Sequence, residues 1–463
     1  MKNRTRPVLW VLSILLAGMA TAQAQEAMRL TLGGSVEMAL KKNPDVQIAQ
    51  KEWRKSKAGV WEAWSALMPV VDGNVSLQHA WSVQKNTIPN FIKSMVGPTF
   101  PGYNEMPDFV KLSFGMENTL RYGVMLTQPL FLGGAGVAGV EMANAASAAA
   151  HHQYEGKRQS LIHQTAGAFY GCLLAKRLVK VQSEALAQAN ANLAIVKSRY
   201  EAGSASGFDK MRAEVEVANL KPEVIVAENN YRSALTGLRM VLGLPKTQSI
   251  EVVGVLAFQS DNYADIGLNA LQEKALGLRP EVSMMHAQKQ MASKGVSLAR
   301  SAFLPKLFFQ TEYSYLGMKD DYDFKQDDMS KGFTSALSLQ IPLFNGLKNS
   351  KQYQKARLDY KIANDSERQL INGINAEVEI GFNAFGEARA KYGAAKESID
   401  LAEEALRLAN LLYEEGASTQ LDVLSSQLAL TRARLNYASA LFDYQVARYN
   451  LRRVTGQLTG VLE

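Results

Sequence analysis

The chain has 463 residues, with 51 lysines and arginines against 44 aspartates and glutamates. Without the three cations of a predicted export signal the basic count is 48, so the mature formal charge is +4. This mild charge argues against a nucleic-acid partner. The single cysteine, Cys172, excludes a disulfide bond within the chain, and its apolar neighbours predict a buried thiol.

The first 24 residues have the pattern of a signal peptide. Three cations precede an apolar run, residues 8–20, and a small-residue cleavage site, residues 22–24. The predicted mature chain begins near Gln25, and the lack of a cysteine there argues against lipid attachment. No later segment has 18 consecutive apolar residues, so we expect no membrane-spanning helix. The exported chain is then either soluble outside the cytoplasm or crosses a membrane as strands.

An internal repeat determines the predicted architecture. Asn43-Pro44 matches Arg279-Pro280 at an offset of 236 residues, and later matches have an offset of 213. The later matches are Pro129 with Pro342, Tyr200 with Tyr413, Gly203 with Gly416, Asp209 with Asp422 and Gly243 with Gly456. The first half therefore contains 23 extra residues, located between Pro69 and Pro129.

Each half is predicted to contain one helix of moderate length, two strands and a long helical hairpin. The first repeat, 25–245, has its helix at 32–67, strands at 68–82 and 112–128, and hairpin at 133–243. The second repeat, 268–463, has its helix at 268–304, strands at 306–317 and 332–344, and hairpin at 346–456. We expect the linker, 246–267, to join the halves outside the hairpins. The proline-rich segment 87–108 is predicted to be a long loop.

The predicted strands alternate between apolar and polar residues. The apolar faces comprise Val71, Val75, Leu77, Leu120, Tyr122, Val124, Leu126, Leu307, Phe309, Tyr313, Tyr315, Phe333, Leu337 and Leu339. Alternation alone is compatible with a soluble sandwich or a membrane barrel. The export signal and the aromatic-rich face favour the barrel. Four strands cannot close around a polar lumen, and lipid does not tolerate open sheet edges, so we predict three copies with twelve strands.

Two proline-free runs, 133–221 and 343–463, predict very long helices, because about seventy residues form a helix about 100 Å long. Apolar residues around the second turn form two neighbouring heptad seams on each helix. Before the turn the first seam is Ile399, Ala402, Leu406, Ala409 and Tyr413, and the second is Leu401, Ala405, Leu408 and Leu412. After the turn the first seam is Val423, Ser426, Leu430, Ala433, Tyr437, Ala440, Tyr444, Ala447 and Leu451, and the second is Leu421, Leu424, Leu428, Leu435, Ala438, Phe442 and Tyr449. Two seams predict a neighbour on each side, as in a cylinder of helices or a layered bundle. Pro222 predicts an interruption with a kink.

Together these features resemble the outer-membrane efflux protein family, the TolC-like channel-tunnels. The resemblance covers nearly the whole mature chain and includes Pro-Leu-Phe after the second strand of each half, at Pro129 and Pro342, and two Tyr-x-x-Gly tips. It implies a mainly α fold with a transmembrane β-barrel portion. Long antiparallel coiled-coil hairpins of two tandem repeats would form an α-barrel, and four strands per protomer would contribute to a 12-stranded trimeric β-barrel. The implied location is the outer membrane of a Gram-negative bacterium, extending into the periplasm.

The resemblance also implies partners and a docking site. The partners are two further copies in a homotrimer, outer-membrane lipid, a periplasmic adaptor (membrane fusion protein) and an inner-membrane pump that is proton-driven or of the ABC class. In the family the helix turns at the tips dock the adaptor. The docking candidates are therefore Gly203, Ser204, Ala205, Gly416, Ala417 and Ser418. A structural role, in which the glycines only end helices, is compatible with docking.

The candidates for a periplasmic gate are Tyr413, Asp422 and Asp209. The family's gate uses acidic residues just after the second tip, and Asp422 matches the first of them. Ser425 stands at the second acidic position and Ser418 at the basic one, which weighs against a doubly acidic, salt-bridged gate. Asp422 is equally compatible with a role as a helix-start acid. In a trimer, three such aspartates facing one axis would repel and raise their pKa.

We therefore expect the exit duct of a tripartite export system that passes small toxic compounds or drugs to the exterior. One alternative is the exit duct of a type I protein-secretion system. A second alternative, from another class, is an exported coiled-coil scaffold or adhesin whose strands form a sandwich. No catalytic triad, carboxylate pair, phosphate-binding loop or metal-spaced His/Cys set predicts an enzyme, a cofactor or a metal site.

Overall fold

The computed structural model describes residues 27–261 and 263–460. The predicted signal peptide, 1–24, lies outside the described residues. The chain divides into two compact units, which are considered separately. The first unit consists of Met1–Arg54, Ala149–His286 and Asp365–Glu463, and the second consists of Lys55–Ala148 and Ala287–Asn364.

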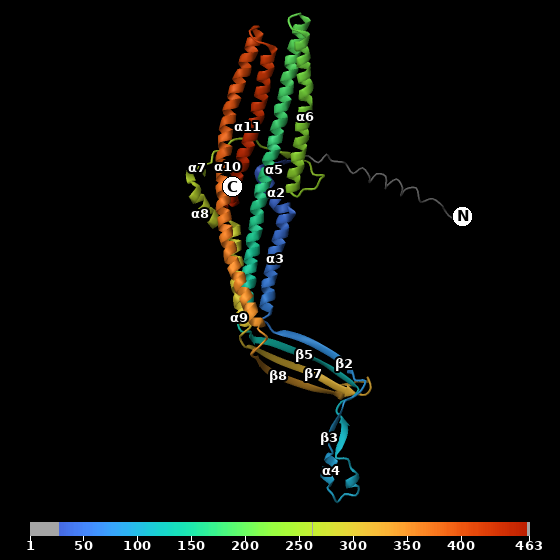
Figure 1. Cartoon of the computed structure of the whole chain (residues 1–463). Coiled ribbons are helices and arrows are strands. Elements are labelled where there is room, and N and C mark those ends of the chain that lie inside the picture. Colours follow the sequence, from blue (N-terminus) through green and yellow to red (C-terminus); the bar gives the residue numbers. More distant parts are fainter. Residues whose placement is uncertain (1–26, 262, 461–463) are drawn as a thin grey trace, which may run out of the picture. The chain divides into compact units, whose positions relative to one another are not determined.

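The main helices occur as two sets of equal lengths (Figure 1). The first set is α2 (Leu32–Lys42), α3 (Pro44–Ser65), α5 (Ala135–Glu201) and α6 (Gly207–Val241), with 11, 22, 67 and 35 residues. The second set, with the same four lengths, is α8 (Leu268–Leu278), α9 (Pro280–Ser301), α10 (Lys348–Glu414) and α11 (Gln420–Val454). The predicted interruption at Pro222 is wrong, because α6 is continuous through it. A proline removes only one donor from this 35-residue hydrogen-bond ladder.

The moderate helices predicted at 32–67 and 268–304 are each two helices in the structure. The breaks fall at Asn43 and Arg279, whose ψ angles are both 127°. A proline follows each, and its ring excludes the preceding residue from the helical region. The side chains at the breaks are bonded to the hairpins. Asn43 donates from Nδ2 to the carbonyl of Val241 at 2.9 Å, and Arg279 pairs with Glu377 at 2.6 Å.

The second unit contains a four-stranded antiparallel sheet in the order β2-β5-β7-β8 (Figure 1). Its strands are β2 (Val70–His79), β5 (Asn118–Phe131), β7 (Lys306–Lys319) and β8 (Met329–Gln340). The first repeat thus supplies β2 and β5, and the second supplies β7 and β8. Strands β2 and β8 lie at the edges, each with a single partner strand among the described residues.

The register places the predicted apolar residues on one face. Tyr122 lies opposite Tyr315 with the rings stacked at 5.1 Å, and Tyr313 lies opposite Phe333. The other face is polar and carries the ion pair of Arg121 with Glu312, whose N–O distance is 2.7 Å. The predicted alternation is therefore confirmed.

The strand predicted at 112–128 and the loop predicted at 87–108 are wrong in part. Residues 80–117, which we call the arm, contain a second hairpin of β3 (Lys85–Pro89) with β4 (Phe109–Ser113), joined by α4 (Phe91–Val96) and η1 (Tyr103–Glu105). Gly115, with φ of 142°, breaks the alternation between β4 and β5. Glycine adopts this backbone conformation without strain. The alternation of apolar and polar residues alone did not indicate that the strand breaks here. The edge strand β8 also starts at Met329 and ends at Gln340, not at 332 and 344.

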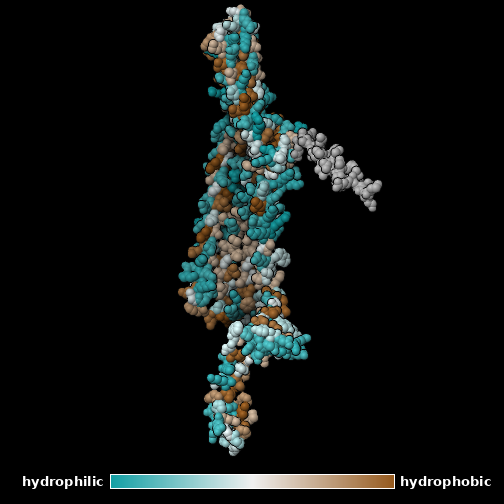
Figure 2. Space-filling model, turned by 90° about the vertical axis from the view of Figure 1, so that its right-hand side faces the viewer, coloured by the Kyte–Doolittle hydropathy of each residue, from teal (hydrophilic) through white to brown (hydrophobic). Residues whose placement is uncertain are grey.

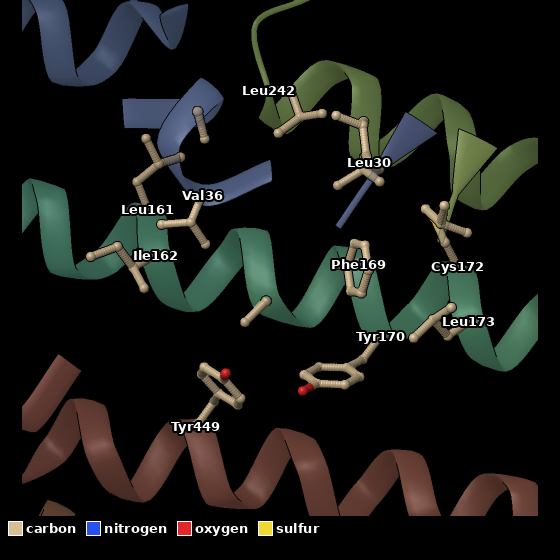
Figure 3. Packing of buried hydrophobic residues seen from close by; sticks show 14 of the residues in the cluster. Leu30, Val36, Leu161, Ile162, Phe169, Tyr170, Cys172, Leu173, Leu242 and Tyr449 are labelled. Carbon is tan, nitrogen blue, oxygen red and sulfur yellow. The ribbon is translucent and has the colours of Figure 1, made fainter. Parts of the chain in front are cut away.

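The first unit has two buried apolar clusters. In one, Phe169 and Tyr170 of α5 lie near Tyr449 of α11 (Figure 3). The short strands β1 (Met28–Leu30) and β6 (Ile250–Val252) pair in parallel beside it. Cys172 is fully buried there, and burial raises the pKa of its thiol to about 12. The prediction of a buried thiol is confirmed, and the thiol is unreactive at neutral pH because almost none is ionised.

The predicted linker packs on α11 over part of its length. Residues 257–261 are bonded to it by three side chains. Tyr444 donates from its hydroxyl to the carbonyl of Gln259 at 2.7 Å, and Gln445 donates to the carbonyl of Ala257 at 2.6 Å. Arg448 pairs with Asp261. The linker, which also contains the short helix α7 (Tyr263–Ile266), is thus attached to α11, although Val255, Ala257 and Gln259 are exposed. Its mixed composition concealed this, because each contact pairs residues that are far apart in sequence.

The two seams around the second turn differ in burial. Leu406, Ala409, Val423 and Leu430 of the first seam are buried. The second seam is exposed toward the tip, with exposed fractions of 66% at Leu401, 42% at Leu408, 46% at Leu412, 54% at Leu421 and 58% at Leu428, whereas Ala438 and Tyr449, further along it on α11, are buried. Figure 2 shows apolar side chains at the surface of the hairpins toward their tips. Toward the tip, the described residues provide no neighbour that covers this seam.

No helix in residues 27–261 and 263–460 combines the length and the apolar character needed to cross a membrane.

Gly456→Ala should destabilise the protein, and Gly237→Ala should not. Gly456 has φ of +74°, and an added Cβ would lie 2.8 Å from Cβ of Leu278. A side chain in that conformation costs about 1–3 kcal/mol. An added Cβ at Gly237, inside α6, meets nothing within 4 Å, so alanine there should stabilise the helix by about 0.5–1 kcal/mol. Thermal unfolding in detergent compares the two variants, and equal midpoints would contradict this account.

Candidate functional site

The tip of the first hairpin is a tight turn between α5 and α6. Gly203 has φ of 75°, a left-handed conformation that glycine adopts without strain. Its N–H donates to the carbonyl of Tyr200 at 3.0 Å, and the N–H of Ser204 donates to the carbonyl of Arg199 at 2.8 Å. These two bonds form a Schellman motif, which satisfies the last carbonyls of α5.

The tip of the second hairpin, between α10 and α11, repeats this geometry. Gly416 has φ of 73°, and its N–H donates to the carbonyl of Tyr413 at 3.2 Å. The N–H of Ala417 donates to the carbonyl of Leu412 at 2.8 Å. The glycines of both tips therefore end helices. They are also exposed, and a Cβ added at Gly203 or Gly416 would meet nothing within 4 Å. The space over both turns is open to a partner.

Each tip then begins its next helix with a capping box. At the second tip the N–H of Thr419 donates to the Asp422 carboxylate at 2.8 Å, and the N–H of Asp422 donates to Oγ1 of Thr419 at 3.3 Å. At the first tip Ser206 and Asp209 make the same reciprocal bonds, at 3.2 and 3.1 Å. Both aspartates thus have a capping role in the single chain.

Hydrogen bonds from the Thr419 hydroxyl and backbone N–H lower the pKa of Asp422. This direction is opposite to the rise expected from three aspartates around one axis. The single chain contains only the hydrogen-bonding contribution, because the repulsion requires further copies. Ser425 donates its hydroxyl to the carbonyl of Asp422 at 2.9 Å, and Ser418 lies half-buried in the turn. Both positions therefore carry an uncharged serine side chain.

Besides the contact of Tyr170 with Tyr449 in the buried cluster, side chains of Arg199 and Arg434 join the hairpins closer to the tips, and the sequence analysis missed these contacts. The guanidinium of Arg199, on α5, lies 4.4 Å from the ring centroid of Tyr413, on α10. Further from the tips, Arg434 of α11 pairs with Glu403 of α10 at 2.9 Å and with Glu184 of α5 at 3.5 Å. The sequence carried one signal for the Arg199 contact, a difference between the two repeats. The tyrosine at the first tip, Tyr200, follows a cation, Arg199, whereas its counterpart Tyr413 follows the apolar Leu412.

The structure brings Tyr413 into the contact between hairpins, and it places Asp209 and Asp422 in separate capping boxes. The six docking candidates lie in the two turns. Within the described residues, no group of three or more His, Cys, Asp or Glu side chains is arranged to hold a metal ion.

Comparison with known proteins adds to this geometry. Residues 35–244 and 271–457 match the family model described as outer membrane efflux protein. The chain is 23% identical over 344 residues to the outer membrane protein TolC of Vibrio cholerae, covering 74% of this chain and 78% of that protein. It is 22% identical over 447 residues to the alkaline protease secretion protein AprF of Pseudomonas aeruginosa, covering 94% and 86%.

The fold has solved counterparts. The crystal structure of the Campylobacter jejuni CmeC outer membrane channel aligns with a TM-score of 0.73 at 19% identity, covering 92% of this chain and 85% of that chain. At this identity the likeness establishes the fold.

Thr419→Ala should loosen the second tip without unfolding the hairpins. Loss of a cap costs about 1 kcal/mol, or about fivefold in the local opening equilibrium. Amide hydrogen exchange of the peptides around residue 419 measures it, with Glu415→Gln as the control within the same turn. Unchanged exchange in Thr419→Ala would show that the capping box does not hold the tip.

Asp422→Asn should give the same loosening with a defined pH dependence. A carboxylate whose pKa is lowered on folding stabilises the folded tip above its ordinary value of 3.8, and this stabilisation is lost as pH falls through the lower folded value. The variant should therefore exchange faster than the parent at pH 7, and the difference should vanish in strong acid. A difference independent of pH would contradict this.

Proposed function

The chain belongs to the outer membrane efflux protein family, and we propose that it is the exit duct of a tripartite export system. The family consists of outer-membrane ducts and not of enzymes. In the proposal, the duct receives small toxic compounds from an inner-membrane pump through a periplasmic adaptor. It releases them outside and is gated at the helical tips. The observation that carries the proposal is the incomplete sheet, which has one apolar face, one polar face and two open edges.

The open edges support a homotrimer. The backbone N–H and C=O groups along the outer sides of β2 and β8 have no partner strand among the described residues. In lipid such groups cost several kcal/mol each, so the sheet must close. Four strands from each of three copies give a twelve-stranded barrel, wide enough for an aqueous lumen. The apolar face would contact outer-membrane lipid, and the polar face with Arg121 and Glu312 would line the lumen.

The exposed seams support the same assembly for the helices. Leu401, Leu408 and Leu428 are exposed in one chain although they continue a heptad pattern. A neighbouring copy on each side would bury these seams and close the hairpins into a cylinder. Monomeric soluble proteins rarely leave such contiguous apolar surface in water.

We assign the gate to the tips. The Arg199–Tyr413 contact holds the second hairpin against the first, and Arg434 adds a second link. Such contacts are electrostatic and local, so they can break without unfolding either helix. In the proposed gate, movement of α10 and α11 away from α5 opens the end of the cylinder. Asp422 sets the start of the moving helix α11, Asp209 sets the start of α6, and both bring negative charge to the opening.

The adaptor would dock at the turns. Gly203, Ser204 and Ala205 and their counterparts Gly416, Ala417 and Ser418 have small side chains, and both glycines have open space above them. Small residues permit close approach of another helix. A partner that binds the separated hairpins better than the joined ones would shift the gate toward the open state.

A second candidate function is the exit duct of a type I protein-secretion system. It is favoured by the match with the alkaline protease secretion protein AprF, which covers 94% of this chain. The duct is the same in both cases, and the pump, proton-driven or ABC, distinguishes them. The third expectation, an exported scaffold or adhesin, loses its support because the family match extends over both repeats.

Arg199→Ala should raise the basal single-channel conductance of the purified protein in planar bilayers. The variant removes one of the links between the hairpins, worth about 0.5–1 kcal/mol at an exposed site, or a two- to fivefold shift toward the open state. Arg212→Ala is the matched control, because Arg212 makes the same kind of contact with Phe208 of its own helix, at 4.7 Å. Equal conductance in the two variants would show that the Arg199–Tyr413 contact does not hold the gate closed. If the protein forms no channel at all, the proposal of an exit duct is wrong.

Gly416→Trp should abolish crosslinking to the adaptor and leave trimers intact. Gly416→Ala is the control, because both variants place a side chain at the positive φ but only tryptophan fills the space over the turn. Chemical crosslinking in cells that express the cognate adaptor, followed by affinity purification, reports docking. If the tryptophan variant crosslinks as well as the alanine variant does, the second tip is not a docking surface.

A further inference from the structure

We propose that the arm of one copy docks against the acidic turn of a neighbouring copy, with Lys85 of the arm facing Asp327 of the turn. The acidic turn comprises residues 320–328, between β7 and β8. This interaction surface rests on the proposed trimer, because its partner is a second copy of this chain.

One half of this contact is visible within the single chain. The first part of the acidic turn is bonded to the second leg of the chain's own arm. The N–H of Glu117 donates to the carboxylate of Asp320 at 3.0 Å, and the side-chain amide of Asn118 donates to the carbonyl of Asp320 at 3.1 Å. Residues 117 and 118 lead from the arm into β5, which is the sheet neighbour of β7. The arm and the turn therefore meet at the same end of the sheet.

The second part of the turn and the first leg of the arm adjoin the two open edges of the four-stranded sheet. The second part of the turn, η2 (Gln326–Asp328), leads into the edge strand β8, and the first leg of the arm leaves the edge strand β2. Antiparallel pairing throughout the sheet gives β2 and β8 opposite directions. A β8–β2 junction between copies is then also antiparallel, and it brings η2 of one copy beside the first leg of the next copy's arm.

The turn has uncompensated negative charge at this place. Residues 319–328 contain two lysines and five aspartates, a formal charge of −3. Lys319 pairs with Asp328 at 2.9 Å and Lys325 with Asp323 at 3.5 Å. Asp327 is exposed, and the described residues provide no ion-pair partner for it.

The arm has uncompensated positive charge at its base. In the β3–β4 register Lys85 lies opposite Ser113, and Lys111 lies opposite Thr87. Both lysines therefore lie on one face of the hairpin. Both are exposed and lack an ion-pair partner among the described residues. At the far end of the arm, by contrast, Lys93 is compensated by Asp108 at 2.6 Å. The free cations of the arm are therefore those next to the sheet, where the neighbouring turn would lie.

The first experiment is a disulfide crosslink in the full-length protein. Oxidation of Lys85→Cys/Asp327→Cys in membranes should give dimers and trimers on denaturing gels, and either single variant should give monomers. Glu105→Cys/Asp327→Cys, with its first cysteine at the far end of the arm, is the matched negative control. The native Cys172 is buried and does not contribute. Light scattering in detergent establishes the oligomer independently. Trimers without a crosslink overturn this inference alone, whereas monomers overturn the proposed trimer.

The second experiment tests the charges. Lys85→Glu and Asp327→Lys should each lower the temperature at which trimers dissociate in detergent, and Lys85→Glu/Asp327→Lys should recover it. The loss should shrink at high ionic strength, because salt screens exposed charges. Glu105→Lys should leave the temperature unchanged. Additive losses in the double variant would show that the two side chains do not face each other. Binding of Lys85 to lipid phosphate would give a loss with Lys85→Glu that Asp327→Lys does not rescue.

Discussion

The edges of the four-stranded sheet set the main physical constraint on this protein. Each edge carries backbone N–H and C=O groups that have no partner strand among the described residues. Water can satisfy such groups, but a bilayer cannot. A sheet with one apolar and one polar face and two open edges is therefore only part of a structure. The exposed seam on α10 and α11 likewise requires a packing neighbour. Leu401 and Leu428 continue a heptad pattern but remain exposed in one chain.

Within the first unit, polar side chains at the helix breaks and along α11 bond separate segments to one another. The two short helices of each repeat are attached to their hairpin at the residue before a proline, through Asn43 in the first repeat and Arg279 in the second. The linker is bonded to α11 through Tyr444, Gln445 and Arg448. These contacts bury polar groups in pairs, so their cost of desolvation is offset by hydrogen bonds. The assembly can then depend on surfaces that are already formed in the single chain.

The tips combine stiff and breakable parts. The Schellman motifs and capping boxes satisfy the backbone groups at the ends of the four long helices, so each turn keeps its shape. The contacts between the hairpins are of another kind, because Arg199 on Tyr413 and Arg434 on Glu184 join exposed or half-buried side chains. Such contacts cost little to break. The turns are therefore held by backbone hydrogen bonds, whereas single exposed or half-buried side chains make the lateral contacts near them.

The sequence by itself determined the repeat, the long hairpins, the faces of the strands and the position of both tips. These features depend on local patterns: heptad spacing, alternation, glycine at a left-handed position and an aspartate three residues after Ser206 or Thr419. Only the tertiary structure decided the strand order, the packed linker and the second hairpin within the arm. It also decided the Arg199–Tyr413 and Arg448–Asp261 contacts. Their residues are about 200 positions apart in sequence, and which of many arginines meets which ring or carboxylate depends on how the helices are set side by side.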